Sequence, residues 1–306
     1  MNVLVTGATG FVGQRLVPSL LEAGHEVSAL VRDRTKYDPP EGVTVFEGDV
    51  LEPTGLDAAL DGVDAAYYLI HAMGGGRGFE ERDRRGARNF AAAAERAGVD
   101  RVIYLSGLGV EGEDLSAHLN SRREVEAVLG RGTYDLTVLR AAIIIGHGSA
   151  SFRIVRQLCS RLPVMTTPRW VKTRVQPIAI ADVIAYLVGV LDAPETAGDT
   201  FEIGGPEVLT YREMLAVVGR ILTGREPIIL PVPVLTPRLS AYWVDLVTDV
   251  PAGVAYPLID GMVADVVVTD DRIRSLVPID LTHFETAVER ALAEEADAES
   301  AADGAA

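Results

Sequence analysis

The first half of the chain alternates short apolar runs with amphipathic stretches. The apolar runs are bounded by turn residues and predict buried strands, at 2–7, 25–32, 43–49, 64–70, 101–107 and 135–146. Apolar positions at helical spacing predict helices over 11–23, 79–98 and 117–129. Strands that alternate with helices predict a parallel sheet covered on both faces. We therefore expect an α/β fold with a doubly wound parallel sheet.

The pattern is looser after residue 146. Helices are predicted over 151–161, 209–222 and 283–293, a strand over 200–205, and a short strand that runs into a helix over 175–191. Thr210 and Glu213 have the spacing of a capping box, and Asp182 is expected to cap the helix that runs to residue 191.

These elements predict a main domain and a smaller cap. The main domain is expected over 1–150 and 175–205, and the cap over 151–174 and 206–293. Residues 227–268 are rich in proline and apolar residues, which fits a cap, a pocket wall or a docking surface for a protein partner or a second copy. The acidic tail, 294–306, is expected to be disordered.

Composition excludes several classes of protein. A formal charge of −16 over 306 residues argues against nucleic acid as a partner. No apolar run reaches the roughly 18–20 residues of a membrane span, and no leader precedes the first strand, so we expect a soluble, cytoplasmic protein. Only two of the 28 basic residues are lysines, Lys36 and Lys172, which together with the acidic surface indicates a high-salt, halophilic cytoplasm.

Metal chemistry is not indicated. Cys159 is the single cysteine, so an internal disulfide or a cysteine-based zinc site is excluded, and it is expected to fill the core. The five histidines show no clustering with acidic residues, and no metal site is expected.

The stretch TGATGFVG, residues 6–13, joins the first predicted strand to the first helix. Gly7 permits the tight turn, Gly10 lets the backbone approach a pyrophosphate, and Gly13 lets the helix pack on the strand. The amides at the start of the helix then face the phosphates. We expect this turn, with Thr9, Phe11 and Val12 between its glycines, to bind a dinucleotide in a Rossmann-type domain.

The residues after the second and third strands bear on which dinucleotide is bound. An acidic residue after the second strand would bind a ribose 2′-hydroxyl, whereas Arg32 offers a fork for a 2′-phosphate and Arg34 is a second cation nearby. This favours NADP over NAD, although Asp33 is also within reach of a ribose. Asp49 is expected to accept from the adenine amino group with Val50 beside the ring; the alternative is a turn residue.

Several segments resemble one family when they are taken in order. TGATGFVG, GDV (48–50), YLSG (104–107), RAAIIIG (140–146) and VQPIAIADV (175–183) are similar to segments of atypical short-chain dehydrogenase/reductases. Residues 149–170, 201–215 and 235–251 resemble its NAD(P)H-binding, epimerase-like branch, near the NmrA-like proteins and an accessory subunit of respiratory complex I. The resemblance implies a Rossmann domain with NADP or NAD and a small C-terminal domain over the nicotinamide.

The resemblance also implies a catalytic Tyr-x-x-x-Lys pair and a serine at the end of the preceding strand. The chain contains no Tyr-x-x-x-Lys sequence. At the matching helix, His118 stands in the place of the tyrosine and Arg122 in that of the lysine, while Ser106 ends the fifth strand. An imidazole can exchange protons near neutral pH, and Arg122 can hold the cofactor ribose but cannot relay a proton. The alternative is a helix that binds ribose and does no chemistry.

His71 follows the fourth strand, at the sheet edge where ligands bind in open α/β folds. It is expected either to line the nicotinamide pocket or to cap its strand. Arg140, at the end of the sixth strand, can bind substrate or brace the sheet.

Three functions remain open from the sequence. The first is an oxidoreductase that acts on a small apolar carbonyl or quinone-like compound. The second is a non-catalytic NADP(H) redox sensor or assembly factor. The third is a nucleotide-sugar epimerase or dehydratase, which the apolar cap favours least because a sugar diphosphate needs cationic contacts.

Overall fold

The structure is a computed structural model that describes residues 1–71, 78–109, 116–167, 169–231, 247–251 and 261–304. Seven strands form one sheet in the order β11-β6-β5-β4-β1-β2-β3, and every neighbouring pair is parallel. The strands are β1 (Asn2–Thr6), β2 (Glu26–Val31), β3 (Thr44–Glu47), β4 (Ala65–Tyr68), β5 (Arg101–Gly107), β6 (Asp135–Ala141) and β11 (Thr200–Ile203). The order in which strands are added reverses between β1 and β4: β2 and β3 follow on one side of β1, and β4 begins the other side. Such a switch point is the place where open α/β sheets bind ligands.

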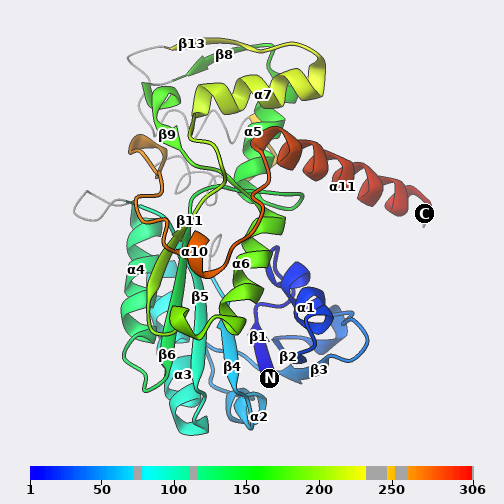
Figure 1. The fold of residues 1–306 in the computed structure, drawn as a ribbon. Helices are drawn as coiled ribbons and strands as arrows, with labels where there is room; N and C mark the ends of the chain where they lie inside the picture. The colour runs from blue at the N-terminus through cyan, green and yellow to red at the C-terminus, as the bar shows by residue number, and fades with distance from the viewer. Residues whose placement is uncertain (72–77, 110–115, 168, 232–246, 252–260, 305–306) are drawn as a thin grey trace.

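Helices cover both faces of this sheet (Figure 1). The helices of the main domain are α1 (Gly13–Glu22), α2 (Leu56–Leu60), α3 (Phe79–Ala97), α4 (Ala117–Leu129) and α6 (Ile180–Asp192). On one face, α1 and α6 pack on inward-facing residues such as Val5 and Ile103. On the other, α2, α3 and α4 pack on residues such as Leu4 and Tyr104. The predicted α/β, doubly wound Rossmann-type sheet is confirmed.

A separate apolar cluster lies beyond the carboxyl ends of the strands, at the top of Figure 1. Its elements include α5 (Ala150–Arg161), α7 (Tyr211–Thr223), α11 (Phe284–Gly304) and the paired strands β8 (Val164–Thr167) and β13 (Ile228–Pro231). Shorter pieces beside it are β7 (Ile144–Ile145), β9 (Arg174–Val175), β10 (Ile178–Ala179) and β12 (Leu209–Thr210), whereas α10 (Ile273–Leu276) packs on the core of the main sheet through Ile273. Cys159 is buried in this cluster, as expected for a core residue. We propose this cluster as the core of the cap.

Two local predictions are wrong. Asp182 does not cap α6, because the helix begins two residues earlier, at Ile180; its buried carboxylate instead accepts hydrogen bonds from the backbone and hydroxyl of Thr282. The acidic tail is helical as far as Gly304, not disordered. Glu294 pairs with Arg15 across the surface, at 2.7 Å, and ties the start of this tail to the main domain.

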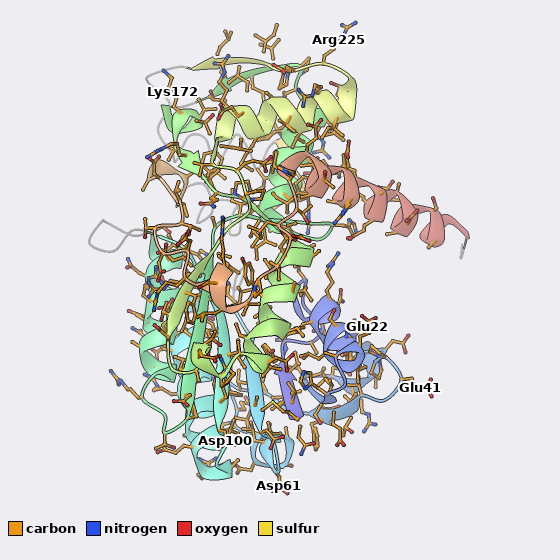
Figure 2. The ribbon with its side chains drawn as sticks, viewed as in Figure 1. Glu22, Glu41, Asp61, Asp100, Lys172 and Arg225 are labelled. Atoms are coloured by element: carbon orange, nitrogen blue, oxygen red, sulfur yellow. The ribbon has the colours of Figure 1, made fainter. Side chains whose placement is uncertain are left out.

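The capping box of Thr210 and Glu213 is present at the start of α7. Most of the proline-rich segment, and with it the predicted docking surface, lies outside the described residues. Within the described chain, no helix combines the length and the apolar character needed to cross a membrane. Labelled charged side chains such as Glu41 and Arg225 point outward from the body (Figure 2).

Candidate functional site

The turn between β1 and α1 has the geometry that its glycines predict. Gly7 has a φ of 75°, and a Cβ atom there would lie 2.9 Å from the carbonyl oxygen of Leu69. The Gly10 amide donates to the Gly7 carbonyl at 2.9 Å. The side chains of Phe11 and Val12 pack against the core beneath α1, so contacts with a ligand are left to their backbone.

A groove runs from this turn along the carboxyl edge of the sheet; we call it the glycine-rich groove. It encloses about 500 Å³. Its described lining residues are Gly7, Thr9, Gly10, Leu30, Arg32, Gly48, Asp49, Val50, Leu51, Tyr68, Leu69, Ile70, His71, Arg82 and Asp83. The groove therefore brings together predicted cofactor residues that follow four strands, β1 to β4, and it extends to the start of α3.

Two predicted ribose-binding residues differ in their surroundings. Arg32 is exposed beside the groove, and within the described part of the chain its guanidinium forms no ion pair. Asp33 is occupied: its carboxylate accepts from the amide and hydroxyl of Thr35 and pairs with Lys36 at 2.8 Å. These contacts, that of Lys36 first, lower the pKa of Asp33 to about 2. The guanidinium of Arg32 is thus available to a ligand, whereas the carboxylate of Asp33 is already engaged by Thr35 and Lys36.

Asp49 has a turn role, which was the alternative considered from the sequence. Its Oδ1 accepts from the amide of Leu51 at 2.8 Å, while the residue also lines the groove. Val50 is buried at the groove floor, and its carbonyl accepts from Asn89. The end of β3 therefore offers an apolar floor with one carboxylate beside it.

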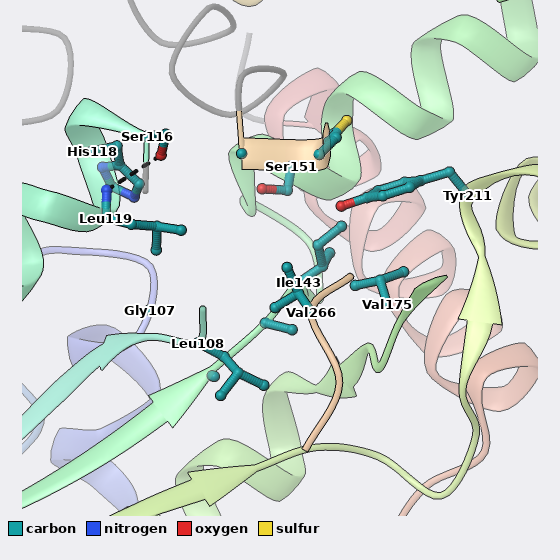
Figure 3. A pocket seen from close by; sticks show the side chains of 14 residues that line it. Gly107, Leu108, Ser116, His118, Leu119, Ile143, Ser151, Val175, Tyr211 and Val266 are labelled. Carbon is teal, nitrogen blue, oxygen red and sulfur yellow. Dashed lines mark hydrogen bonds between the residues drawn. The ribbon is translucent and has the colours of Figure 1, made fainter. Parts of the chain in front are cut away.

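A second cavity, the apolar pocket, lies where α4 faces the cap (Figure 3). Its described lining residues are Gly107, Leu108, Ser116, His118, Leu119, Ala141, Ala142, Ile143, Ser151, Val175, Tyr211, Gly261, Met262 and Val266. Figure 3 shows His118 at one end, and the hydroxyls of Ser151 and Tyr211 across from it. The described lining contains no aspartate, glutamate, lysine or arginine. The pocket therefore suits an uncharged, mostly apolar molecule.

His71 and His118, the histidine pair, stand where the two cavities meet. His71 lines the glycine-rich groove and His118 lines the apolar pocket. His71 Nε2 lies 3.2 Å from His118 Nδ1, and His71 Nδ1 lies 3.0 Å from Oδ2 of the buried Asp83. The predicted replacement for the catalytic tyrosine is thus in contact with the predicted nicotinamide-side residue.

The surroundings of the pair favour neutral imidazoles. Burial, then Arg122 and then His71, lowers the pKa of His118 to about 3. Burial and Arg122 also lower the pKa of His71, against which Asp83 acts by hydrogen bonding and charge. At neutral pH the histidine pair can therefore donate and accept hydrogen bonds without carrying a lasting charge.

Arg122 lies on α4 one turn after His118, as predicted, but it lines neither cavity in the described chain. Its Nη1 donates to the Leu105 carbonyl at 3.0 Å. Its Nε is buried and has no hydrogen-bond partner among the described residues. A buried N–H donor without an acceptor is costly.

Ser106 is brought to a different network. It is buried, and its Oγ donates to Glu126 Oε1 at 2.5 Å. Glu126 also pairs with Arg123 at 2.7 Å and with Arg140 at 2.6 Å. In the described chain Ser106 lines neither cavity, whereas Arg140 pairs with Glu126 on α4 and also lines a further cavity that shares Leu108 and Val266 with the apolar pocket.

Sequence reasoning missed two residues of the groove, Arg82 and Asp83, and two of the pocket, Ser151 and Tyr211. Asp83 had a detectable signal. It shares the buried face of α3 with Ala87 and Phe90, where a carboxylate is out of place unless it has a partner.

Comparison with known proteins places the chain among NAD(P)H-binding proteins. Residues 7–189 match the family described as NAD(P)H-binding. A (4-alkanoyl-5-oxo-2,5-dihydrofuran-3-yl)methyl phosphate reductase of Streptomyces griseus is 31% identical over 228 residues, which are 72% of this chain and 73% of that protein. The mitochondrial NADH dehydrogenase (ubiquinone) 1 alpha subcomplex subunit 9 of Arabidopsis thaliana is 27% identical over 70% of this chain and 56% of its own length.

A solved structure of an NADPH-dependent quinone oxidoreductase from Escherichia coli, complexed with NADPH, has the same fold. It superposes with a TM-score of 0.73 at 22% identity, and the match covers 94% of this chain and 98% of that one. The glycine turn, the groove and the match to the family agree. The chain therefore belongs to the NAD(P)H-binding family of atypical short-chain dehydrogenase/reductases.

Proposed function

We propose that the protein is an NADP(H)-dependent reductase of a small, uncharged carbonyl or quinone-like compound. The observation that carries the proposal is the contact of His71 with His118, which joins the groove of the cofactor to a pocket that suits an apolar substrate. The names of relatives support the same reaction class, since reductases are among them, as does the quinone oxidoreductase among the structures of the same fold.

The described residues fit a nicotinamide dinucleotide. Gly10 leaves the groove open at the turn, and the amides at the start of α1 suit a pyrophosphate. Arg32, without an ion pair in the described chain, supports a 2′-phosphate and hence NADP.

When bound, the reduced nicotinamide supplies a hydride. His118 then has the role of the missing tyrosine: it holds the substrate oxygen by a hydrogen bond and exchanges a proton with it. Ser106 is turned to Glu126, so we assign it to the positioning of α4.

The absence of a cation from the described lining of the apolar pocket bears on the substrate. A phosphate or sugar diphosphate in this pocket would be desolvated without a cationic partner among the described residues, at a cost of several kcal/mol. We therefore propose an uncharged substrate. This differs from the phosphate ester in the name of the Streptomyces griseus relative.

Turnover with a substrate panel tests the proposal. The purified protein in molar salt is mixed with NADPH and with quinones, enones, ketones and aldehydes, and the loss of NADPH absorbance is followed. We expect turnover of at least one apolar compound, and a loss of about 100-fold or more in kcat for His118→Ala. His283→Ala, at an exposed histidine paired with Glu207, is the matched control. NADPH binding without turnover of any compound would contradict the proposal.

A further inference from the structure

We propose that Asp83, His71 and His118 form a proton relay that delivers a proton to the substrate oxygen; this inference rests on the function proposed above. The three groups contact one another in succession. Asp83 Oδ2 is 3.0 Å from His71 Nδ1, and the opposite ring nitrogen of His71 is 3.2 Å from His118 Nδ1. His118 Nε2 is then the ring nitrogen left for a molecule in the apolar pocket, which His118 lines.

The inner part of this chain of contacts is held rigidly. The side chains of His71 and Asp83 are 9% and 3% exposed. Ser121, on α4, donates its hydroxyl to the same Asp83 oxygen at 3.1 Å. A carboxylate buried to this extent must be paired, and here its partners come from the end of β4 and from α4. The relay is therefore a packed feature of the fold, supported by two elements that close on α3.

The contacts dictate the tautomers. An ionised Asp83 can only accept, so His71 carries its proton on Nδ1 and leaves Nε2 as an acceptor. His118 then donates from Nδ1, and its Nε2 lone pair faces the substrate. This form takes a proton from an alcohol. With one further proton, both nitrogens of His71 donate, and His118 accepts at Nδ1 and donates from Nε2.

The protonated form balances the reduction. The hydride brings two electrons to the carbonyl carbon, the C=O π bond breaks, and its electron pair goes to oxygen. The His118 Nε2–H bond breaks as the new O–H bond forms. His118 Nδ1 takes the proton of His71 Nε2, and His71 keeps its Nδ1 proton on Asp83. Water returns one proton through His118 Nε2 before the next cycle.

The charges around the histidine pair set the direction of its pH dependence. In the described chain they are Arg82 and Asp83 on α3 and Arg122 on α4, with the phenols Tyr68 and Tyr104 on the adjacent strands. Arg122 disfavours and Asp83 favours the proton that reduction consumes. Reduction should therefore accelerate as the pH falls, and the reverse oxidation of the alcohol as the pH rises.

Asp83→Asn tests the relay through the pH dependence of turnover, which the loss of a purely structural residue would not change. We expect kcat to fall by about 100-fold or more, the Kd of NADPH to change by less than about threefold, and the opposite pH trends of reduction and oxidation to disappear. In the His118→Ala background, Asp83→Asn should lower kcat little further, because both substitutions interrupt the same relay. Additive losses in this double-mutant cycle would overturn the proposal.

Asp182→Asn is the matched control. Asp182 is another buried carboxylate that accepts two hydrogen bonds, and it lines neither cavity in the described chain. It should lower stability as Asp83→Asn does, and leave the pH trends unchanged. Loss of the pH trends in Asp182→Asn as well would mean that destabilisation alone removes them, which would overturn the relay.

Nitrogen-15 NMR of the histidines separates failure of the relay from failure of the proposed function. It needs no substrate. We expect both rings to carry the proton on Nδ1 in the wild type, and Asp83→Asn to shift both. A change at His71 alone, or Nε2–H tautomers in the wild type, would overturn the relay even if the enzyme turns over. The expected NMR result in a protein that reduces nothing would instead contradict the proposed function.

Discussion

A Cβ atom at Gly13 would lie 2.2 Å from the carbonyl oxygen of Gly7, so α1 packs on the end of β1 only because this position has no side chain. At Gly10 the nearest atom is the same oxygen, but at 3.2 Å, and the residue faces the glycine-rich groove. The two glycines of one motif therefore serve different purposes, packing and ligand access.

Replacement of each glycine by alanine should separate these purposes. Gly13→Ala forces helix and strand apart, and we expect a loss of about 1–3 kcal/mol in the free energy of unfolding. Gly10→Ala should leave stability nearly unchanged and weaken NADPH binding. Denaturant unfolding and calorimetric titration measure the two effects. Equal destabilisation by both variants would contradict this division.

Arg32→Ala should change the choice between the two nicotinamide dinucleotides. A charge-assisted hydrogen bond contributes about 1.5–3 kcal/mol, so we expect NADPH affinity to fall by about 10- to 100-fold and NADH affinity to change little. Lys36→Ala is the control, because this nearby cation is already paired with Asp33. Titration of each variant with both dinucleotides tests the expectation, and parallel losses of both would contradict NADP preference.

The low pKa of His118 should make the protein less stable in mild acid. Its folded-state pKa, about 3, is below the usual 6.5, so the unfolded chain binds the proton more readily. The free energy of unfolding therefore has its full value above about pH 6.5. It decreases as the pH falls toward 3, with a slope of up to about 1.4 kcal/mol per pH unit.

Denaturant unfolding of the wild type and His118→Gln at several values between about pH 6.5 and pH 5 measures this slope. The slope should be smaller in His118→Gln, whereas His283→Gln should follow the wild type. If His118→Gln keeps the full slope, the histidine is not buried in its neutral form.

Most of the fold could be read from the periodicity of the chain. The bounds predicted for β5 and α4 are those observed, because each is a long element with a clear pattern and a clear end. The tail was misjudged for a physical reason. Its charge suggested disorder, but residues 289–300 are rich in Ala and Glu, which are strong helix formers, and Glu294 and Glu295 pair with Arg15 and Arg156.

The candidate site was only partly predictable. The glycine turn has a local signature, and the family resemblance located His118 by its place on a helix. The contact of His71 with His118 joins residues 47 positions apart and depends on how the end of β4 meets α4. Ser106 shows the opposite case. Its position in the sequence matched that of the family's serine, but its hydroxyl donates to Glu126, twenty residues later.

The two cavities draw on separate stretches of the polypeptide. Every described residue that lines the glycine-rich groove comes at or before Asp83, and every one that lines the apolar pocket comes at or after Gly107. A chimera joined in the turn at Gly98, between α3 and β5, would exchange the lining of one cavity without that of the other. The contact of His71 with His118 crosses this junction, so it is the contact that both parents of a working chimera must share.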